Sequence, residues 1–399
     1  MTHSVGIRLT FSLAIIVALG PAAIDMYLAS MPAMALELNT SYAATQITLT
    51  VFLIFMGIGQ LFFGPWSDAI GRKMPLLLGL MTYILASLGA ALAPNLESLI
   101  VARAIQGIGA SMAIVVVMSM VRDLTDGVAA AQLYALLNTI VALGPIAAPA
   151  LGGFIGESYG WRGVMLVLGI LGLLVLLNTL YTLKESLAAK DRIPLNLKSV
   201  TQGYWKIVKD KTFGFNLLAL SAVYFFLFTY IGGSAFVYQS SYGLSTEQFG
   251  LVFGLTSISL ILGASSSAYL VKKIAISRLA MFGAVIMMIG TTTCIAMYLL
   301  NMGLVGTVSG IALGLFGLGI LEATLMAIAM DSQDSALGAC AALLGAIPML
   351  LSSSATPIAG QLVESDTLYW LMLMSAIGPI ILVLVFFGTR QKPTQDLIQ

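Results

Sequence analysis

The chain of 399 residues contains twelve apolar runs, each about as long as a helix that crosses a lipid bilayer. Backbone outside a helix finds no hydrogen-bonding partners in hydrocarbon. The twelve apolar runs therefore predict a bundle of membrane-spanning helices. The expected spans lie near residues 8–31, 44–66, 75–93, 97–121, 131–156, 163–183, 213–237, 247–271, 276–300, 303–330, 335–361 and 367–388.

The composition agrees with an all-α integral membrane protein. Hydrophobic residues make up 59% of the chain and charged residues 9%, whereas a soluble domain carries roughly 25% charged residues. Cys294 and Cys340 lie within apolar runs without metal-ligand spacing and are interpreted as buried hydrophobic residues. The sequence offers no nucleotide-binding loop, no catalytic constellation, no metal site and no support for nucleic-acid binding, which favours a transporter over an intramembrane enzyme or a receptor.

The basic residues predict the orientation and the division of the chain. With the N-terminus in the cytoplasm, 16 of the 18 Lys and Arg residues fall in cytoplasmic segments, as the positive-inside rule requires. Both termini are therefore expected in the cytoplasm. The polar stretch 184–212 separates six spans from six, so we expect two pseudo-symmetric six-helix bundles at 1–183 and 213–399, a cytoplasmic linker between them, and a short tail.

A polar segment between the second and third spans carries the first motif. Residues 64–73 read Gly-Pro-Trp-Ser-Asp-Ala-Ile-Gly-Arg-Lys, which predicts a tight turn at the membrane edge. The pattern G-x-x-x-D-x-x-G-R-K resembles the cytoplasmic loop between the second and third helices of Major Facilitator Superfamily transporters. A charged turn without special function is the alternative.

Further motifs narrow the resemblance to the Bcr/CflA group of drug/proton antiporters, which includes phenicol and bicyclomycin exporters. The fourth span contains a buried arginine, and the fifth is similar to the G-x-x-x-G-P-x-x-G-G motif of exporters, with Ala148 in place of one glycine. Ala69 and Ala29 also depart from the group's pattern. The segments that carry the resemblance are 25–28, 99–110, 121–124, 144–153 and 160–162.

This resemblance implies a proton-coupled exporter in the bacterial inner membrane. The substrates would be small, largely apolar drugs, with phenicols such as chloramphenicol among them, and the proton gradient would replace any cofactor. The expected partners are the drug, protons and the lipid bilayer, and the expected state is a monomer. A proton-coupled uptake symporter for a small metabolite is the alternative transporter.

Residues at two places are candidates for conformational gating. Asp68 is expected to accept from backbone donors near Ser335 and to pair with Arg72 or Arg122. In the fifth span, proline removes helix hydrogen bonds and glycine allows close backbone approach, so this helix is expected to bend and to pack tightly. Ordinary helix packing is the alternative. The gating candidates are Gly64, Asp68, Gly71, Arg72, Arg122, Gly144, Pro145, Pro149, Gly152 and Gly153.

Three charged residues lie well inside spans, where an unpaired charge costs about 2.5–3.5 kcal/mol and commonly marks a transport pathway. Asp25 and Arg103 both lie roughly 9 Å from the outer edge of their spans, so the two are expected to meet. Asp25 would carry the proton, and Arg103 would adjust the pKa of the Asp25 carboxyl group. Glu322 would form a separate site for protons or substrate. A permanent structural pairing is the alternative for Asp25, a fixed tie between helices for Arg103, and a protonated, silent side chain for Glu322.

Aromatic and polar side chains in several spans are candidates for the substrate site. An adaptable apolar surface with a few polar groups suits small apolar drugs. Lipid-facing or packing roles are the alternative for most of them. The candidates are Tyr27, Asn138, Tyr224, Phe228 and Glu322.

Overall fold

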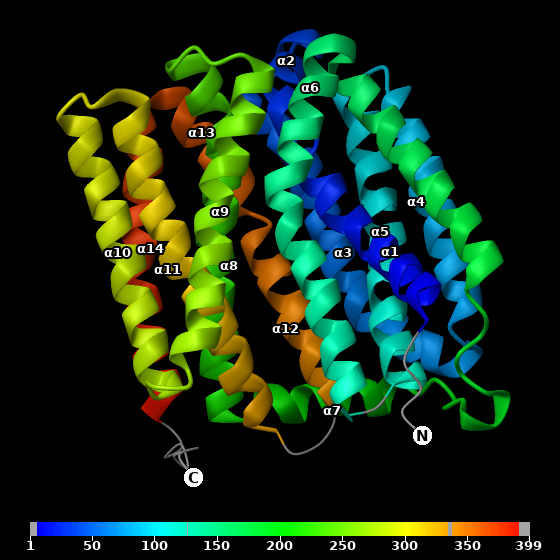
Figure 1. The fold of residues 1–399 in the computed structure, drawn as a ribbon. Coiled ribbons are helices and arrows are strands. Elements are labelled where there is room, and N and C mark those ends of the chain that lie inside the picture. The colour runs from blue at the N-terminus through cyan, green and yellow to red at the C-terminus, as the bar shows by residue number, and fades with distance from the viewer. Residues whose placement is uncertain (1–5, 126, 334–336, 391–399) are drawn as a thin grey trace. The chain divides into compact units, whose positions relative to one another are not determined.

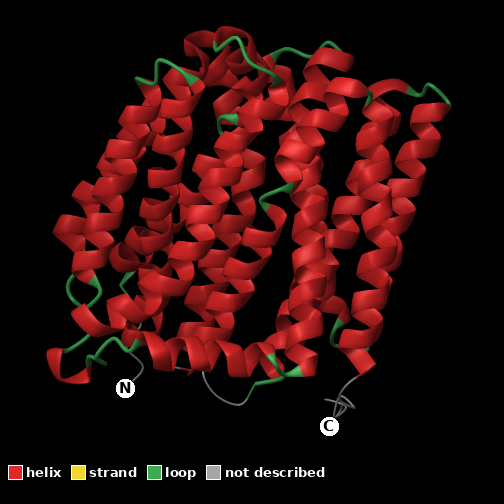
Figure 2. Cartoon of the chain, turned by 180° about the vertical axis from the view of Figure 1, so that it is seen from behind, coloured by secondary structure: helices red, strands yellow, loops and turns green. Residues whose placement is uncertain are grey.

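The computed structural model describes residues 6–125, 127–333 and 337–390 (Figure 1). Helices make up 88% of the structure, and no strand occurs in the part of the chain that is described (Figure 2). The prediction of an all-α membrane fold is confirmed.

One compact unit consists of residues 1–197 together with 245–251. Its long central helix is α5, which packs against α3, α4 and α1. Close packing on α5 uses glycine: a Cβ atom at Gly109 would lie 2.6 Å from the backbone nitrogen of Tyr83 on α4. The helices of this unit are α1 (Ile7–Asp25), η1 (Leu28–Ser30), α2 (Met31–Glu37), α3 (Tyr42–Ile70), α4 (Lys73–Ala91), α5 (Leu96–Leu124), α6 (Gly127–Thr182) and η2 (Ala189–Asp191).

The second compact unit consists of residues 198–244 and 252–399. Here α8 contacts α11, α12, α13 and α14, and α10 packs on α11, where a Cβ at Gly310 would lie 2.6 Å from the Cys294 backbone. The helices are α7 (Leu197–Val208), α8 (Lys211–Phe236), the π-helix η3 (Val237–Ser241), α9 (Thr246–Leu270), α10 (Ile276–Leu299), α11 (Gly303–Asp331), α12 (Leu337–Ser352), α13 (Ala355–Ser365) and α14 (Thr367–Arg390). The first residues of α7 and α9 belong to the other unit.

The number of membrane crossings follows from one long helix. Eleven helical segments among the described residues are long and apolar enough to span a membrane. One of them, within α6, has 51 residues and reverses direction at Gly160, whose backbone adopts φ 65° and ψ −178°. At 1.5 Å per residue, each arm of α6 is long enough for one crossing. The structure therefore accommodates the twelve predicted spans.

Two of the predicted spans are interrupted. The first, expected as one helix over 8–31, ends at Asp25 and resumes as η1 and α2. Pro32 at the start of α2 has no N–H to donate to the preceding turn, which is why the helix restarts there. The span expected over 335–361 is divided between α12 and α13.

The predicted turn between the second and third spans is present, but it is shorter than residues 64–73 because most of this segment is helical. Helix α3 continues through Pro65 to Ile70, and only Gly71 and Arg72 separate it from α4. Proline's fixed φ fits a helix at the cost of a hydrogen bond, whereas Gly71 with φ 104° supplies the left-handed conformation that ends α3.

Candidate functional site

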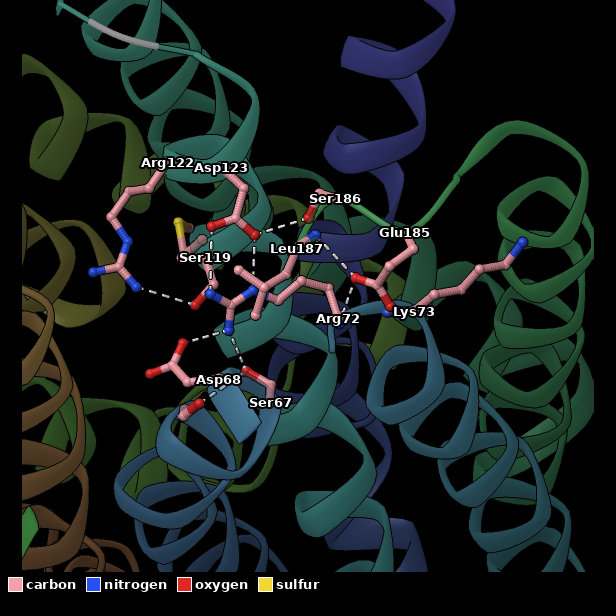
Figure 3. Close-up of polar contacts among 12 residues, drawn as sticks. Ser67, Asp68, Arg72, Lys73, Ser119, Arg122, Asp123, Glu185, Ser186 and Leu187 are labelled. Atoms are coloured by element: carbon pink, nitrogen blue, oxygen red, sulfur yellow. Dashed lines mark hydrogen bonds and ion pairs between the residues drawn. The ribbon is translucent and has the colours of Figure 1, made fainter. Parts of the chain in front are cut away.

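Arg72 is the centre of a polar network where α3 meets α4 (Figure 3). Its side chain is only 4% exposed. Nη1 donates to Oδ1 of Asp68 at 2.6 Å and to Oγ of Ser67 at 2.8 Å, and Nε donates to Oδ2 of Asp123 at 2.8 Å. The structure thus brings Asp68 and Arg72 together, as expected, and adds a second carboxylate from the end of α5.

Asp123 was not among the predicted site residues, although it lies in the predicted motif over 121–124. The sequence predicts its neighbour Arg122, or Arg72, as the partner of Asp68. In the structure Arg122 donates to Oγ of Ser119 at 3.2 Å and makes no ion pair with Asp68. Consecutive helix residues point in directions about 100° apart, so only one of the two can face Arg72.

The segment that follows α6 completes this network. The Glu185 carboxylate accepts from the backbone N–H groups of Arg72 at 2.8 Å, Lys73 at 3.2 Å and Leu187 at 3.1 Å. It therefore caps the first turn of α4, whose N–H groups have no partner within the helix. A Cβ at position 71 would lie 2.6 Å from Oε2 of Glu185, so this arrangement depends on glycine.

Two further contacts fix the start of the linker on the same turn. Ser186 donates from Oγ to Oδ2 of Asp123 at 2.8 Å, and the N–H of Ile193 donates to the carbonyl of Asp68 at 3.0 Å. We call Ser67, Asp68, Arg72, Asp123 and Glu185 the Arg72 cluster. The backbone donors near Ser335, which were expected to meet Asp68, lie outside the described residues.

Hydrogen bonds and neighbouring charges favour the ionised states of Arg72 and Glu185. Burial acts to lower the pKa of the Arg72 guanidinium, but hydrogen bonds and charges from Asp123 and Asp68 raise it above the ordinary value. Burial acts to raise the pKa of Glu185, but the three backbone N–H groups and the charge of Arg192 lower it below the ordinary value.

Asp25 occupies the last position of α1, at the interruption of the first span, and is 3% exposed. It makes no hydrogen bond or ion pair with another described residue. Arg103 does not pair with it. The Arg103 guanidinium donates to the carbonyl of Ala23 at 2.9 Å, hydrogen-bonds the Gln106 side chain, and lies 4.3 Å from the Tyr27 ring centroid.

The interruption of the helix explains this placement of Arg103. Where α1 ends, its last carbonyls have no helical partner, so Ala23 offers a free acceptor. Arg103 consequently contacts the first span on both sides of Asp25, through Ala23 and Tyr27, and ties this span to α5. Arg103 thus reaches the neighbourhood of Asp25, but the expected contact between the carboxylate and the guanidinium does not occur.

The glycines of the exporter motif lie against the interrupted helix. A Cβ at Gly144 would collide with the Pro21 side chain, and one at Gly152 with the carbonyl of Met26, directly after Asp25. A Cβ at Gly153 would lie 2.7 Å from the carbonyl of Thr246. Close backbone approach is thus required at these positions. Helix α6 continues through Pro145 and Pro149, while Gly64 has only ordinary contact with Val115.

Three of the predicted substrate residues come together in the second unit. Tyr224 on α8 donates from its hydroxyl to Oε1 of Glu322 on α11 at 2.8 Å, and its ring centroid lies 6.3 Å from that of Phe228. Of the other two, Tyr27 is fully buried with its hydroxyl 3.3 Å from Oγ1 of Thr48, and Asn138 is exposed on α6.

Apolar spans, interrupted helices and charged side chains within the spans are typical of a multi-pass membrane transporter. It belongs to the Major Facilitator Superfamily, whose family model matches residues 13–341.

Relatives of known name fall in the same class. The chain is 33% identical over 98% of its length to YdgK, an uncharacterized MFS-type transporter of Bacillus subtilis, covering 97% of that protein. It is 26% identical to a bicyclomycin resistance protein homolog of Haemophilus influenzae, with 94% of each chain covered. It is 34% identical to the multidrug resistance protein MdtL of Escherichia coli over 48% of this chain and 50% of that one. The predicted family is confirmed.

Solved structures share the fold at low sequence identity. A bacterial homolog of the human lysosomal transporter Spinster matches with a TM-score of 0.75 at 15% identity over 96% of both chains. A D-xylose–proton symporter matches with a TM-score of 0.75 at 17% identity, over 96% of this chain and 98% of that one.

Proposed function

We propose that this transporter exports small, largely apolar drugs in exchange for protons. Two relatives carry names of drug resistance, the bicyclomycin resistance protein homolog and MdtL. The exporter motif of α6 supports the same direction of transport, and its Gly144 and Gly152 lie where α6 meets the interrupted first span. Phenicols such as chloramphenicol belong to the proposed substrate class.

The placement of Asp25 carries the proposal. The Asp25 carboxyl group has no partner among the described residues and is buried where a spanning helix is interrupted. Burying such a group in a membrane costs free energy, and residues of this kind commonly mark a transport pathway. We assign the proton to this carboxyl. Arg103 then acts as a positioning residue, because it holds the two sides of the interruption through Ala23 and Tyr27.

The proton gradient supplies enough free energy for such an exchange. One proton driven by about 100 mV and one pH unit yields roughly 2.3 plus 1.4 kcal/mol. This corresponds to a gradient of several hundredfold for a neutral compound, without ATP or any other cofactor.

Glu322, Tyr224 and Phe228 form the proposed substrate contact in the second unit. An aromatic surface beside a hydrogen-bonded carboxyl combines apolar contact with a polar group for orientation. Asn138 and Tyr27 remain candidates from the first unit, although Tyr27 has no exposed surface in this structure.

The distribution of Lys and Arg supports a bacterial inner-membrane protein with both termini in the cytoplasm, and we propose that it works as a monomer. This orientation would place the Arg72 cluster on the cytoplasmic side. A reporter fused to the C-terminus that is active only in the cytoplasm tests it.

A susceptibility panel in a bacterial host without its own drug exporters tests the proposed function. We expect the parent chain to raise the inhibitory concentration of at least one apolar drug several-fold, and Asp25→Asn to remove this protection at equal expression. Lower accumulation of the drug must accompany resistance. Proton-driven accumulation of a metabolite, with no effect on any drug, would favour the uptake symporter.

A further inference from the structure

Helix α7, within the segment that joins α6 to α8, carries side chains that the transport mechanism leaves unused. Trp205 is 64% exposed, while Ile207 on another side of the same helix is 5% exposed. Lys198 and Trp205 lie seven residues apart on α7, and Lys209 directly follows the helix with its N–H bonded to the Trp205 carbonyl at 3.2 Å, so the three share one face. Nζ of Lys209 lies 5.2 Å from the Trp205 ring centroid. We call these three residues the Trp205 stripe.

The chain path holds this stripe near the membrane. Helix α7 ends at Val208, and the spanning helix α8 begins at Lys211. The three steps between them allow about 10 Å even in an extended chain. The turn is tighter than that, because the N–H of Asp210 donates to the carbonyl of Ile207 and the Asp210 side chain caps α8. Figure 1 shows α7 lying crosswise at this end of α8.

We propose that the Trp205 stripe binds the anionic headgroups of the adjacent lipid leaflet. An exposed indole beside ammonium groups suits the membrane interface, where tryptophan combines an apolar ring with a polar N–H and lysine meets phosphate. The charge is complementary: the segment from Lys184 to Lys211 holds seven Lys or Arg residues against three acidic ones. Ile207 is buried, so the stripe lies on the side of α7 that the protein leaves exposed.

Tryptophan fluorescence of the full chain in lipid nanodiscs tests this proposal. The signal of Trp205 is the emission of the parent minus that of Trp205→Phe, which removes the contribution of the other three tryptophans. Nanodiscs of phosphatidylcholine, with or without one quarter phosphatidylglycerol, would contain phospholipids brominated near the headgroup as quenchers. The double variant Lys198→Gln/Lys209→Gln is compared with Lys272→Gln/Lys273→Gln, a matched loss of two charges at the turn between α9 and α10.

We expect bromolipids to quench Trp205 at least twofold more strongly in the anionic nanodiscs. Lys198→Gln/Lys209→Gln should remove that difference, and Lys272→Gln/Lys273→Gln should retain it. Equal quenching with and without phosphatidylglycerol would overturn the headgroup assignment. Strong quenching by aqueous iodide in both nanodiscs, with no effect of bromolipid, would overturn it too and would mean that the stripe faces water or a soluble partner.

Discussion

Arg72 joins two helices because its planar guanidinium can serve two carboxylates at once. Asp68 lies four residues before it on α3, whereas Asp123 comes from α5, 51 residues away. Removing the guanidinium leaves Asp123, which is 13% exposed, without its main counter-charge. The Arg72–Asp123 pair should therefore matter more for stability than surface ion pairs do.

A double-mutant cycle measures this coupling. Arg72→Gln and Asp123→Asn, separately and together, should give an interaction of about 1–3 kcal/mol in the free energy of unfolding in detergent. The matched cycle with Arg122→Gln and Asp68→Asn should give less than about 0.5 kcal/mol, since those two side chains make no ion pair. Equal coupling in the two cycles would mean that the network is wrongly assigned.

Glu185 gives the Arg72 cluster a dependence on pH. Its folded-state pKa lies below the ordinary value of 4.5, so its stabilising effect is fully present above that pH and is lost as the pH falls through the folded-state pKa. Glu185→Gln should cost about 0.5–1 kcal/mol at pH 7, in the lower part of the range for helix caps because the side chain is exposed.

The stability difference between the parent and Glu185→Gln should therefore shrink below pH 4.5. Unfolding in detergent at pH 7 and at several acidic values measures it, with Glu157→Gln at the other end of the first unit as a control for general acid effects. A difference that stays constant down to pH 3.5 would contradict the capping role.

At the scale of helices, the lengths of the spans were predictable and their interruptions were not. Pro32 and Pro357 lie near the restarts of α2 and α13, yet α1, α3 and α6 continue through Pro21, Pro65 and Pro145. A proline removes one hydrogen bond in every case. Whether the helix then breaks depends on which neighbouring groups satisfy the freed carbonyl, and these come from elsewhere in the fold.

The contacts of the candidate site were likewise predictable from the sequence only where the two residues are close in the chain. Asp68 and Arg72 are four residues apart across the end of α3, so their contact followed from local spacing. Glu185 reaches the same turn from 113 residues away, and Arg103 meets Ala23 instead of Asp25 because the end of α1 leaves a carbonyl free. Those contacts depend on tertiary packing, which the sequence pattern does not encode locally.

The packing of α6 on the interrupted first span predicts a difference between two glycines of one helix. A Cβ at Gly152 would collide with the Met26 carbonyl, whereas one at Gly169 would make ordinary contact with Leu88 at 3.4 Å. Gly152→Ala should therefore reduce drug export several-fold, with drug binding less affected than turnover, and Gly169→Ala should transport normally. Equal transport by the two variants would show that close approach at Met26 is not needed.

At the scale of the whole molecule, we propose that a proton binding at Asp25 drives drug movement. Asp25 is held in a protein-lined interruption of the first span, while Tyr224, Phe228 and Glu322 lie in the second unit. Alternating access would couple proton binding at Asp25 to drug binding in the second unit, because each state of the transporter would favour either the proton or the drug.

Drug movement in proteoliposomes with an imposed pH gradient tests this claim most directly. The parent should move an apolar drug against its concentration gradient when the proton gradient is present and only downhill when it is collapsed. Asp25→Asn should lose uphill movement, and Glu322→Gln should retain it with a weakened affinity for drug. Uphill movement by Asp25→Asn at the parental rate would contradict the account and would place the proton elsewhere, with Glu322 the next carboxyl to test.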